Sequence, residues 1–237
     1  MPWTAAVGQL QVGQGGRPCT AVLVAPDLIV TAAHCLFQGE TSGMAAGFAF
    51  HPNFGAQPDL GSSRAFAIRA IGSTAGNGAV DSAMDVAADW ALVGIEPPVR
   101  AVAPVAVARL TTQEILARLR SGASLYTAGY GYGATRELRR HGRCQVVDPP
   151  DSSPVFTQAI LVTDCIIRIG DSGGPIVLID ESGRPNLIGI FSGFGTNGQT
   201  GLAFGSNAAN FAPYLAPPLL SWLGLGSYLG LTSKVHL

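Results

Sequence analysis

The sequence is poor in charge: Asp, Glu, Lys and Arg make up 12% of its 237 residues, against about a quarter in ordinary soluble domains. The net charge of −1 gives no reason to expect nucleic acid or an anionic membrane as a partner. A single lysine, Lys234, stands among 14 basic residues in a chain rich in Ala and Gly, and this bias indicates a GC-rich bacterial gene.

Long apolar runs are also missing. The most apolar stretch, residues 219–231, is interrupted by three glycines and is shorter than the roughly 20 residues that a membrane-spanning helix needs. We therefore expect a terminal helix docked on the body of the protein and no membrane contact. The first residues lack the basic and apolar regions of a signal peptide, so we interpret Met1 as a start added to a mature or trimmed chain.

Cysteine is scarce, with four residues: Cys19, Cys35, Cys144 and Cys165. None of them lies in a CxxC or CxxH arrangement, so no metal site is expected. Four cysteines allow three full pairings, and any of these predicts two disulfides and an oxidising compartment, secreted or periplasmic. Cys35 can anchor its segment by pairing with Cys19, 16 positions earlier.

Turn residues are abundant, and 31 Gly and 16 Pro separate many short apolar or alternating runs. These runs predict strands at residues 20–24, 28–31, 48–50, 66–71, 90–95, 124–128, 145–147, 159–163, 176–179 and 187–191. A helix is expected at 111–120, where Thr111 and Glu114 form a capping-box pattern. Many strands and few helices predict an all-β fold of barrels or a sandwich, with residues 97–104 connecting two β halves.

The strongest motif is Gly-Asp-Ser-Gly-Gly-Pro at residues 170–175. A small residue at 170 lets the backbone bend until the N–H groups of Gly170 and Ser172 point into one space. Such a pair can stabilise an oxyanion, and each donor typically contributes about 3–4 kcal/mol. Gly173 and Gly174 would let a substrate backbone come close to this nucleophile. The alternative is a plain glycine-rich turn.

His34 is the candidate base. It follows the apolar run 28–30 in the segment Thr-Ala-Ala-His-Cys, so it lies just past the end of a predicted strand. A lone histidine is more often structural. The adjacent Cys35 and the downstream nucleophile motif favour the catalytic interpretation here.

Asp89 is the candidate acid, because it directly precedes the apolar run 90–95 and its carboxylate can be buried at the start of that strand. The role requires a buried acceptor for the Nδ1–H of the histidine. Asp81 and Asp85 are the alternatives, and we expect both in a solvated loop.

The segments TAAHC, DWAL and GDSGGP, in the order His, Asp, Ser, resemble the trypsin/chymotrypsin family and differ in order from α/β-hydrolases and subtilisins. Pro2-Trp3, Gly-Tyr-Gly at 129–131 and Gly-Ile-Phe-Ser at 189–192 are similar to family segments too. The resemblance implies one protease domain of two six-stranded Greek-key β-barrels, over about residues 1–100 and 101–237, with the active site between them and a C-terminal helix.

The resemblance also implies the chemistry of a serine endopeptidase. Ser172 attacks a peptide carbonyl, His34 transfers the proton, Asp89 orients His34, Ser192 supports Asp89, and the N–H groups of Gly170 and Ser172 hold the oxyanion. The implied partner is a polypeptide substrate, and a proteinaceous inhibitor is a second possible partner. No cofactor is needed, and we expect a monomer. Two alternatives stay open on the same fold: a non-catalytic homologue that serves as a binding module, and an esterase-like hydrolase.

Three features of the sequence need interpretation beside the family pattern. Arg168 replaces a common cysteine four residues before the nucleophile, so the family's late bridge is absent. Cys165 resembles an earlier cysteine of the family, and the resemblance implies that it pairs with Cys144. Asp171 pairs with a new N-terminus in activated trypsin-like zymogens, but Pro2-Trp3 begin this sequence, so Asp171 is expected to find other donors, such as Arg168 or backbone N–H groups. The alternative is a trimmed segment and a collapsed oxyanion hole. A run of basic residues follows the Gly-Tyr-Gly segment and comprises Arg136, Arg139, Arg140, His141 and Arg143. We expect this basic run to be a solvated loop, and the alternative is an electrostatic guide for acidic substrates.

The specificity pocket follows from the same resemblance. The residue six positions before the nucleophile lies at the pocket base, and here it is Ile166, so no carboxylate awaits a cation unless Asp164 swings in. The remaining substrate-binding residues implied by the family pattern are Ser192, Gly193, Phe194 and Gly201. We expect cleavage after small or medium apolar residues such as Ala, Val or Leu.

Overall fold

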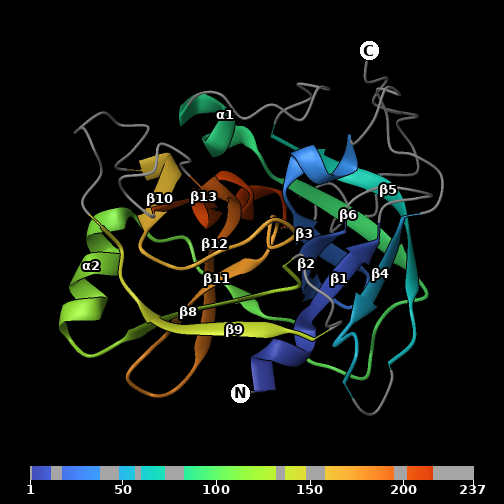
Figure 1. The fold of residues 1–237 in the computed structure, drawn as a ribbon, viewed down its shortest axis with the longest axis horizontal. Helices are drawn as coiled ribbons and strands as arrows, with labels where there is room; N and C mark the ends of the chain where they lie inside the picture. Colours follow the sequence, from blue (N-terminus) through green and yellow to red (C-terminus); the bar gives the residue numbers. More distant parts are fainter. Residues whose placement is uncertain are drawn as a thin grey trace, which may run out of the picture.

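The computed structural model describes residues 2–11, 18–37, 48–56, 60–72, 83–131, 137–147, 158–194 and 202–215. Within these ranges the chain is mostly β structure, and the strands form two bodies that lie side by side (Figure 1). Strands of the first half of the chain, blue to green, form one body, and strands of the second half form the other. Two barrel-like bodies are what the resemblance implied for the fold.

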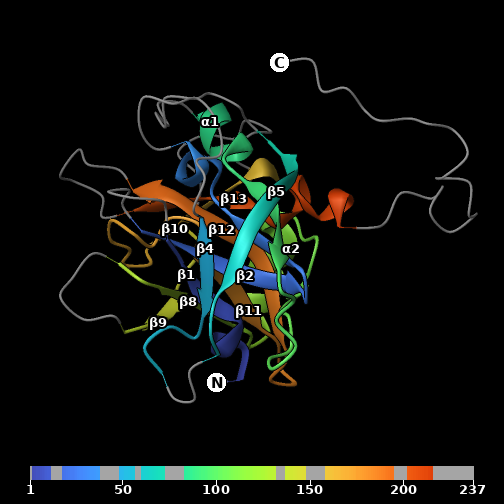
Figure 2. The ribbon, with the colours of Figure 1, turned by 90° about the vertical axis from the view of Figure 1, so that its right-hand side faces the viewer.

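The first body is a closed six-stranded barrel in the order β1-β2-β3-β6-β5-β4. Its strands are β1 (Val7–Gln11), β2 (Cys19–Ala25), β3 (Leu28–Thr31), β4 (Ala49–Pro52), β5 (Ser63–Ile71) and β6 (Ala91–Glu96). All neighbours are antiparallel, and β1 closes the barrel by pairing with both β2 and β4. β4 and β5 face the viewer in Figure 2, with β11 of the second body behind them.

The second body is a sheet in the order β10-β13-β12-β11-β8-β9. Its strands are β7 (Ala106–Val107), β8 (Ser124–Gly129), β9 (Arg139–Cys144), β10 (Ile160–Thr163), β11 (Pro175–Ile179), β12 (Pro185–Phe194) and β13 (Ala203–Asn207). An isolated bridge between Val146 and Thr163 joins the chain just after β9 to β10, so the two edges of the sheet meet in a barrel-like form. The short β7 adds a parallel pair to β12.

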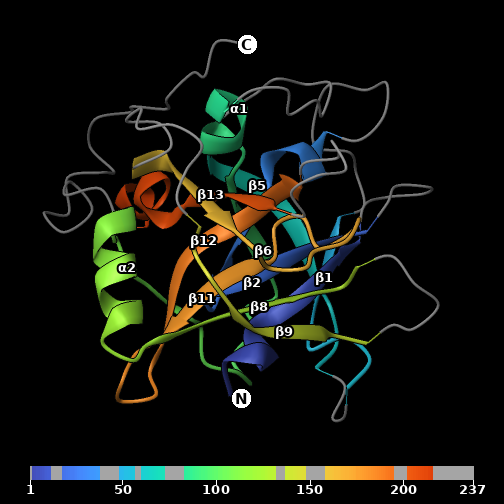
Figure 3. The same cartoon turned by 60° about the vertical axis from the view of Figure 1, so that its left-hand side comes forward.

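In the part of the chain that the structure describes, two α-helices accompany the strands. The predicted helix is α2 (Thr112–Arg120), which flanks the second body on the side away from the first barrel (Figures 1 and 3). Its capping box is complete, because Thr111 Oγ1 accepts the Glu114 N–H at 3.3 Å while the Glu114 carboxylate accepts the Thr111 N–H at 2.7 Å. The second helix, α1 (Ala83–Ala88), was not predicted. The terminal helix expected beyond residue 219 lies outside the described residues.

One strand prediction is wrong. Residues 145–147 are not a strand; the strand is β9, inside the basic run that the sequence assigned to a loop. β9 pairs with β8 and lies at one end of the strand order, where exposed Arg140 stays in water while its backbone pairs with Ala128. Charged residues are tolerated at such a position because the side chain, unlike the backbone, keeps its solvent.

Besides β9, three further strands were not predicted: β1, β7 and β13. β7 has two residues and β13 contains Gly205, so neither shows a clear alternating pattern. A Cβ at Gly205 would come within 2.6 Å of the Ile190 carbonyl on β12, so this close strand approach requires glycine.

The two bodies share a core. The largest cluster of buried apolar residues combines first-barrel residues with Val177, Leu187 and Ile190 of the second body. Continuous packing across the boundary holds the two bodies in a fixed relative position. No helix within the described ranges is long and apolar enough to cross a bilayer.

Candidate active site

His34 lies in η2 (Ala33–Leu36), a short 3₁₀ helix that starts two residues after β3. The neighbouring Cys35 is bonded to Cys19 at the start of β2, with Cα atoms 6.2 Å apart. The disulfide therefore fixes the turn that carries the imidazole to the adjacent strand. The ligand atoms of Cys19, His34 and Cys35 lie within 4.8 Å of one another, but the disulfide leaves no thiolate to bind a metal.

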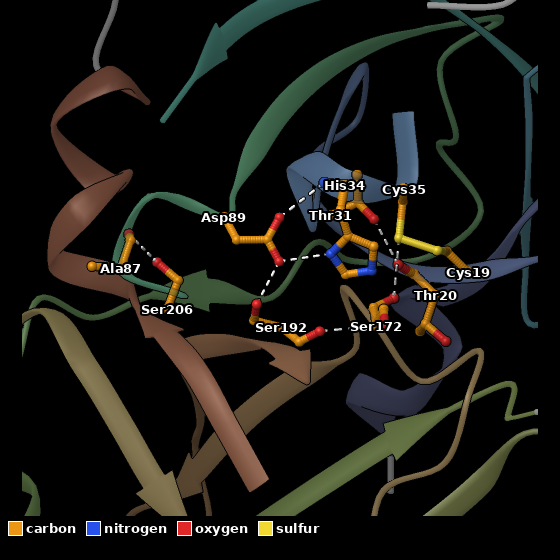
Figure 4. A network of polar contacts seen from close by, with 10 residues as sticks. All are labelled: Cys19, Thr20, Thr31, His34, Cys35, Ala87, Asp89, Ser172, Ser192 and Ser206. Atoms are coloured by element: carbon orange, nitrogen blue, oxygen red, sulfur yellow. Dashed lines mark hydrogen bonds and ion pairs between the residues drawn. A yellow bond between two sulfur atoms is a disulfide. The ribbon is translucent and has the colours of Figure 1, made fainter. Parts of the chain in front are cut away.

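Asp89 lies between α1 and β6 and is 3% exposed. Its Oδ1 accepts the backbone N–H of His34 at 2.8 Å, and its Oδ2 lies 2.7 Å from His34 Nδ1. Ser192 Oγ donates to the same Oδ2 at 2.5 Å (Figure 4). A buried carboxylate is costly unless it is hydrogen-bonded, and these three contacts provide that compensation.

Asp85, the alternative acid, does not lie beside the His34 imidazole. It lies in the first turn of α1 and is partly buried, so the expectation of a solvated loop was wrong for this residue. Asp81 lies outside the described residues. The carboxylate that faces the imidazole is that of Asp89.

The chain just before Asp89 is held by the second body. Ser206 Oγ, on β13, donates to the Ala87 carbonyl at 2.9 Å (Figure 4). Asn210, in η4 (Ala208–Asn210), donates through Nδ2 to the same carbonyl and to Ala159 O, each at 2.8 Å. No motif marks these two side chains, and sequence reasoning missed them.

Ser172 follows a tight turn formed by residues 168–171. Asp171 N donates to Arg168 O at 2.9 Å, and Gly170 has a φ of 98°, which is type II geometry and requires glycine at the third position. Figure 4 shows His34 between Asp89 on one side and Ser172 on the other. The Ser172 hydroxyl lies 3.5 Å from the Ser192 carbonyl. Hydrogen bonds between a nucleophile and its base are often absent before substrate binds.

Two backbone donors at this turn stay free within the described ranges: the N–H groups of Gly170 and Ser172. The surrounding peptide groups are engaged, since Gly174 N donates to Asp171 O at 2.8 Å and Gly173 N donates to Phe191 O at 2.7 Å. The sequence predicted this pair of donors. Held rigidly and unused by the fold, they are suited to bind a developing negative charge.

Asp171 is 3% exposed and its Oδ2 accepts the backbone N–H of Arg168 at 2.7 Å. The sequence suggested either the Arg168 side chain or backbone N–H groups as donors to Asp171. This contact uses a backbone N–H group, and the Arg168 residue is exposed. A Cβ at Gly129 would lie 2.3 Å from Asp171 Oδ1, and one at Gly131 would lie 3.0 Å away. Both glycines of the Gly-Tyr-Gly segment thus make room for this carboxylate. Burial raises the pKa of Tyr130 between them, so its phenol stays neutral.

The second disulfide joins Cys144, at the end of β9, to Cys165, with Cα atoms 4.9 Å apart. Ile166 follows at once and is 66% exposed. Asp164, the alternative pocket acid, accepts the Gln145 N–H through Oδ1 at 2.5 Å.

The candidate pocket residues flank the start of β13. Ala203 pairs with Thr163 of β10 and with Phe194 of β12, which brings the chain around 164–166 near the end of β12. Ser192 is buried and Gly193 partly buried. The side chain of Phe194, and Gly201 as a whole, lie outside the described part of the chain.

Comparison with known proteins supplies independent findings. The family described as Trypsin matches residues 1–215 of the chain. The fold of this chain is similar to that of a Glu endopeptidase in complex with MPD, with a TM-score of 0.66 and 18% sequence identity, over 90% of this chain and 89% of the other. It is also similar to the thermostable serine protease AL20 from an extremophilic microorganism, with a TM-score of 0.59 and 21% identity, over 88% and 97% of the two chains.

A third similar structure is an inactivated protease paralogue from the scabies mite, with a TM-score of 0.61 and 18% identity, over 90% and 92% of the two chains. No curated protein matches the sequence. The same fold therefore occurs in proteins named as proteases and in one named as inactivated. Activity has to be judged from the residues of the site.

Proposed function

The chain belongs to the trypsin family of serine endopeptidases, and we propose that it cleaves peptide bonds with Ser172 as nucleophile, His34 as general base and Asp89 as the carboxylate that orients His34. The observation that carries this proposal is the double contact of Asp89 with His34, through the backbone N–H and through Nδ1. A carboxylate accepts hydrogen bonds and donates none, so Nδ1 carries the ring proton and Nε2 is left as the acceptor for the Ser172 hydroxyl.

The reaction then proceeds in two halves. Ser172 Oγ attacks the carbonyl carbon while its proton passes to His34 Nε2, and the carbonyl oxygen becomes an oxyanion held by the N–H groups of Gly170 and Ser172. Collapse of this intermediate releases the amine, which takes the proton from His34, and leaves an acyl ester on Ser172. Water gives a proton to His34 and attacks the ester, and the second tetrahedral intermediate then releases the acid while His34 returns the proton to Ser172 Oγ.

We propose a pocket for small or medium apolar side chains on the amino side of the cleaved bond. Ile166, at the position implied for the pocket base, offers a 66% exposed apolar side chain and no charge. The nearby Asp164 is hydrogen-bonded to the Gln145 backbone, which supports the view that it is not the partner of a substrate cation. A buried cation without a partner costs several kcal/mol, so Arg and Lys are disfavoured.

We infer that the protein works as a monomeric, single-domain enzyme outside the cytoplasm, secreted or periplasmic, on polypeptide substrates. The two disulfides support this location, since such bonds persist in oxidising compartments. The matched family supports the substrate class, because trypsin-type proteases act on polypeptides.

A fluorophosphonate probe tests the central proposal, because it reacts with a serine that is activated by a base. We expect labelling of Ser172, found by mass spectrometry of the digested protein, and no labelling of Ser172→Ala. Absence of labelling in a folded wild-type protein would identify the chain as a non-catalytic homologue. Comparison of peptide and ester turnover separates an endopeptidase from an esterase-like hydrolase.

A further inference from the structure

Thr20, on β2, is fully buried where the first barrel meets the nucleophile turn. Its backbone N–H donates to Ser172 O at 2.9 Å, and its hydroxyl donates to Gly170 O at 2.8 Å. The hydroxyl also accepts the Tyr130 N–H at 2.9 Å, which directs its own proton toward Gly170. Thus one residue of the first barrel holds both residues that carry the free oxyanion donors.

The peptide unit between Gly170 and Asp171 shows what the hydroxyl does. Its N–H closes the type II turn on Arg168 O at 2.9 Å, and its carbonyl is bound by Thr20 Oγ1. This unit is therefore fixed at both ends. Without the hydroxyl, the buried Gly170 carbonyl would lack this donor and would rotate toward another, and that rotation would pull the N–H away from Arg168. The turn geometry that sets the direction of the Gly170 N–H would then be lost.

The same strand also positions the base. Cys19, the residue before Thr20, is bonded to Cys35, the residue after His34. Two consecutive residues of β2 therefore hold the turn of the base and the turn of the nucleophile. The spacing between the two parts of the site is set by one strand segment and not by a flexible loop.

We propose that Thr20 is a positioning residue whose hydroxyl holds the oxyanion turn in its productive form. The inference rests on the proposed roles of Gly170 and Ser172. Since the oxyanion exists only in the transition state and the tetrahedral intermediate, loss of the hydroxyl lowers kcat and leaves KM little changed.

Two substitutions separate the hydroxyl from the shape of the side chain. Thr20→Val keeps the branched form, including the methyl group that lies 3.5 Å from the Cβ position of Gly174, and removes the donor. Thr20→Ser keeps the donor and removes the methyl group. The matched control is Ser63→Ala, which removes another buried hydroxyl of the first barrel, one that donates to Pro97 O at 2.7 Å.

The experiment measures kcat and KM on a peptide substrate, and the inhibition constant of a peptide aldehyde, which forms a tetrahedral adduct with the serine. We expect Thr20→Val to lower kcat by about 10- to 100-fold, somewhat less than the loss of a whole oxyanion donor, and to weaken aldehyde binding in parallel. KM should change by less than about threefold, and Thr20→Ser should retain most of the activity. Ser63→Ala should leave kcat and aldehyde binding near wild type.

Equal kcat for Thr20→Val, Ser63→Ala and wild type would overturn the inference, as would a Thr20→Ser variant no better than Thr20→Val. If circular dichroism shows that Thr20→Val does not fold, Thr20→Ala takes its place with the same expected outcomes. A wild-type protein that fails to label with fluorophosphonate would instead refute the proposed function, so the two failures are distinguishable.

Discussion

The carboxylate of Asp89 holds His34 at two points, with Oδ2 2.7 Å from the ring Nδ1 and Oδ1 2.8 Å from the backbone nitrogen of the same residue. The first contact fixes the ring and its tautomer, and the second fixes the turn that carries the ring. A single buried side chain thus sets both the direction and the protonation pattern of the proposed base.

Ser172→Ala, His34→Ala and Asp89→Asn are each expected to lower kcat by about 10⁴-fold or more, the magnitude established for the triad of this very family. The losses should not add in double variants, because the three residues act as a unit. Steady-state kinetics on a peptide substrate measure the effect, with Asp85→Asn as the matched control. Near-full activity of Asp89→Asn together with a dead Asp85→Asn would show that the acid is wrongly assigned.

Ser192→Ala removes the hydroxyl that donates to Asp89 Oδ2 and leaves the two His34 contacts in place. A hydrogen bond to a charged group contributes about 1.5–3 kcal/mol, so we expect kcat to fall by about 10- to 100-fold, well short of the loss in Asp89→Asn. Ser182→Ala, on an exposed turn, is the control and should leave kcat unchanged. Equal kinetics for both variants would mean that the contact with Asp89 does not matter for catalysis.

The Cys19–Cys35 disulfide closes a loop of 16 residues around β2 and β3. In the chain-entropy account such a loop stabilises the fold by about 3 kcal/mol, so the double variant Cys19→Ala/Cys35→Ala should unfold at correspondingly lower denaturant. Peptide mapping under non-reducing conditions should also find Cys144 joined to Cys165. A cross-pair such as Cys19 with Cys144 would contradict the assignment of one bridge to each body.

The specificity prediction concerns the residue on the amino side of the cleaved bond. Substrates with Ala, Val or Leu there should be cleaved better than those with Arg or Lys. Selectivity among the apolar residues should be graded, since each additional methylene contributes about 1 kcal/mol. A peptide library read by mass spectrometry provides the ranking. An advantage of about tenfold or more for Arg or Lys, roughly 1.4 kcal/mol in the transition state, would refute this pocket.

The hairpin turn between β11 and β12 provides a pH prediction. Hydrogen bonds from Ser182 and Arg184 lower the pKa of Asp180 to about 2. A carboxyl group whose pKa is lower in the folded state stabilises the protein at pH values above its unfolded-state pKa of about 3.9. This stabilisation is lost as the pH falls toward the folded-state pKa. Wild type should therefore have a higher Tm than Asp180→Asn at pH 6, and the gap should close on acidification to about pH 2. A gap independent of pH would rule out a contribution from ionisation.

The local parts of this protein could be predicted from its sequence. The runs at residues 28–31 and 176–179 are strands in the structure, and the capping box of Thr111 and Glu114 forms as expected. The tight turn before Ser172 also lies where the glycine-rich motif predicts it, with a φ of 98° at Gly170. Such features depend on residues only a few positions apart, so composition and spacing contain the necessary information.

The contacts that join distant segments were decided only by the tertiary structure. Ser206 meets Ala87 across 119 positions, and Thr20 meets Gly170 across 150. The place of β9 within a basic run likewise depends on its neighbour β8, with which it pairs. A hydrogen bond from a buried side chain to the backbone of a distant segment leaves no periodic pattern along the chain. The sequence therefore predicts the turns of His34 and Ser172 and the bridge from Cys35 to Cys19, whereas the packing of the two barrels places Thr20 and Ser206 against the segments that they hold.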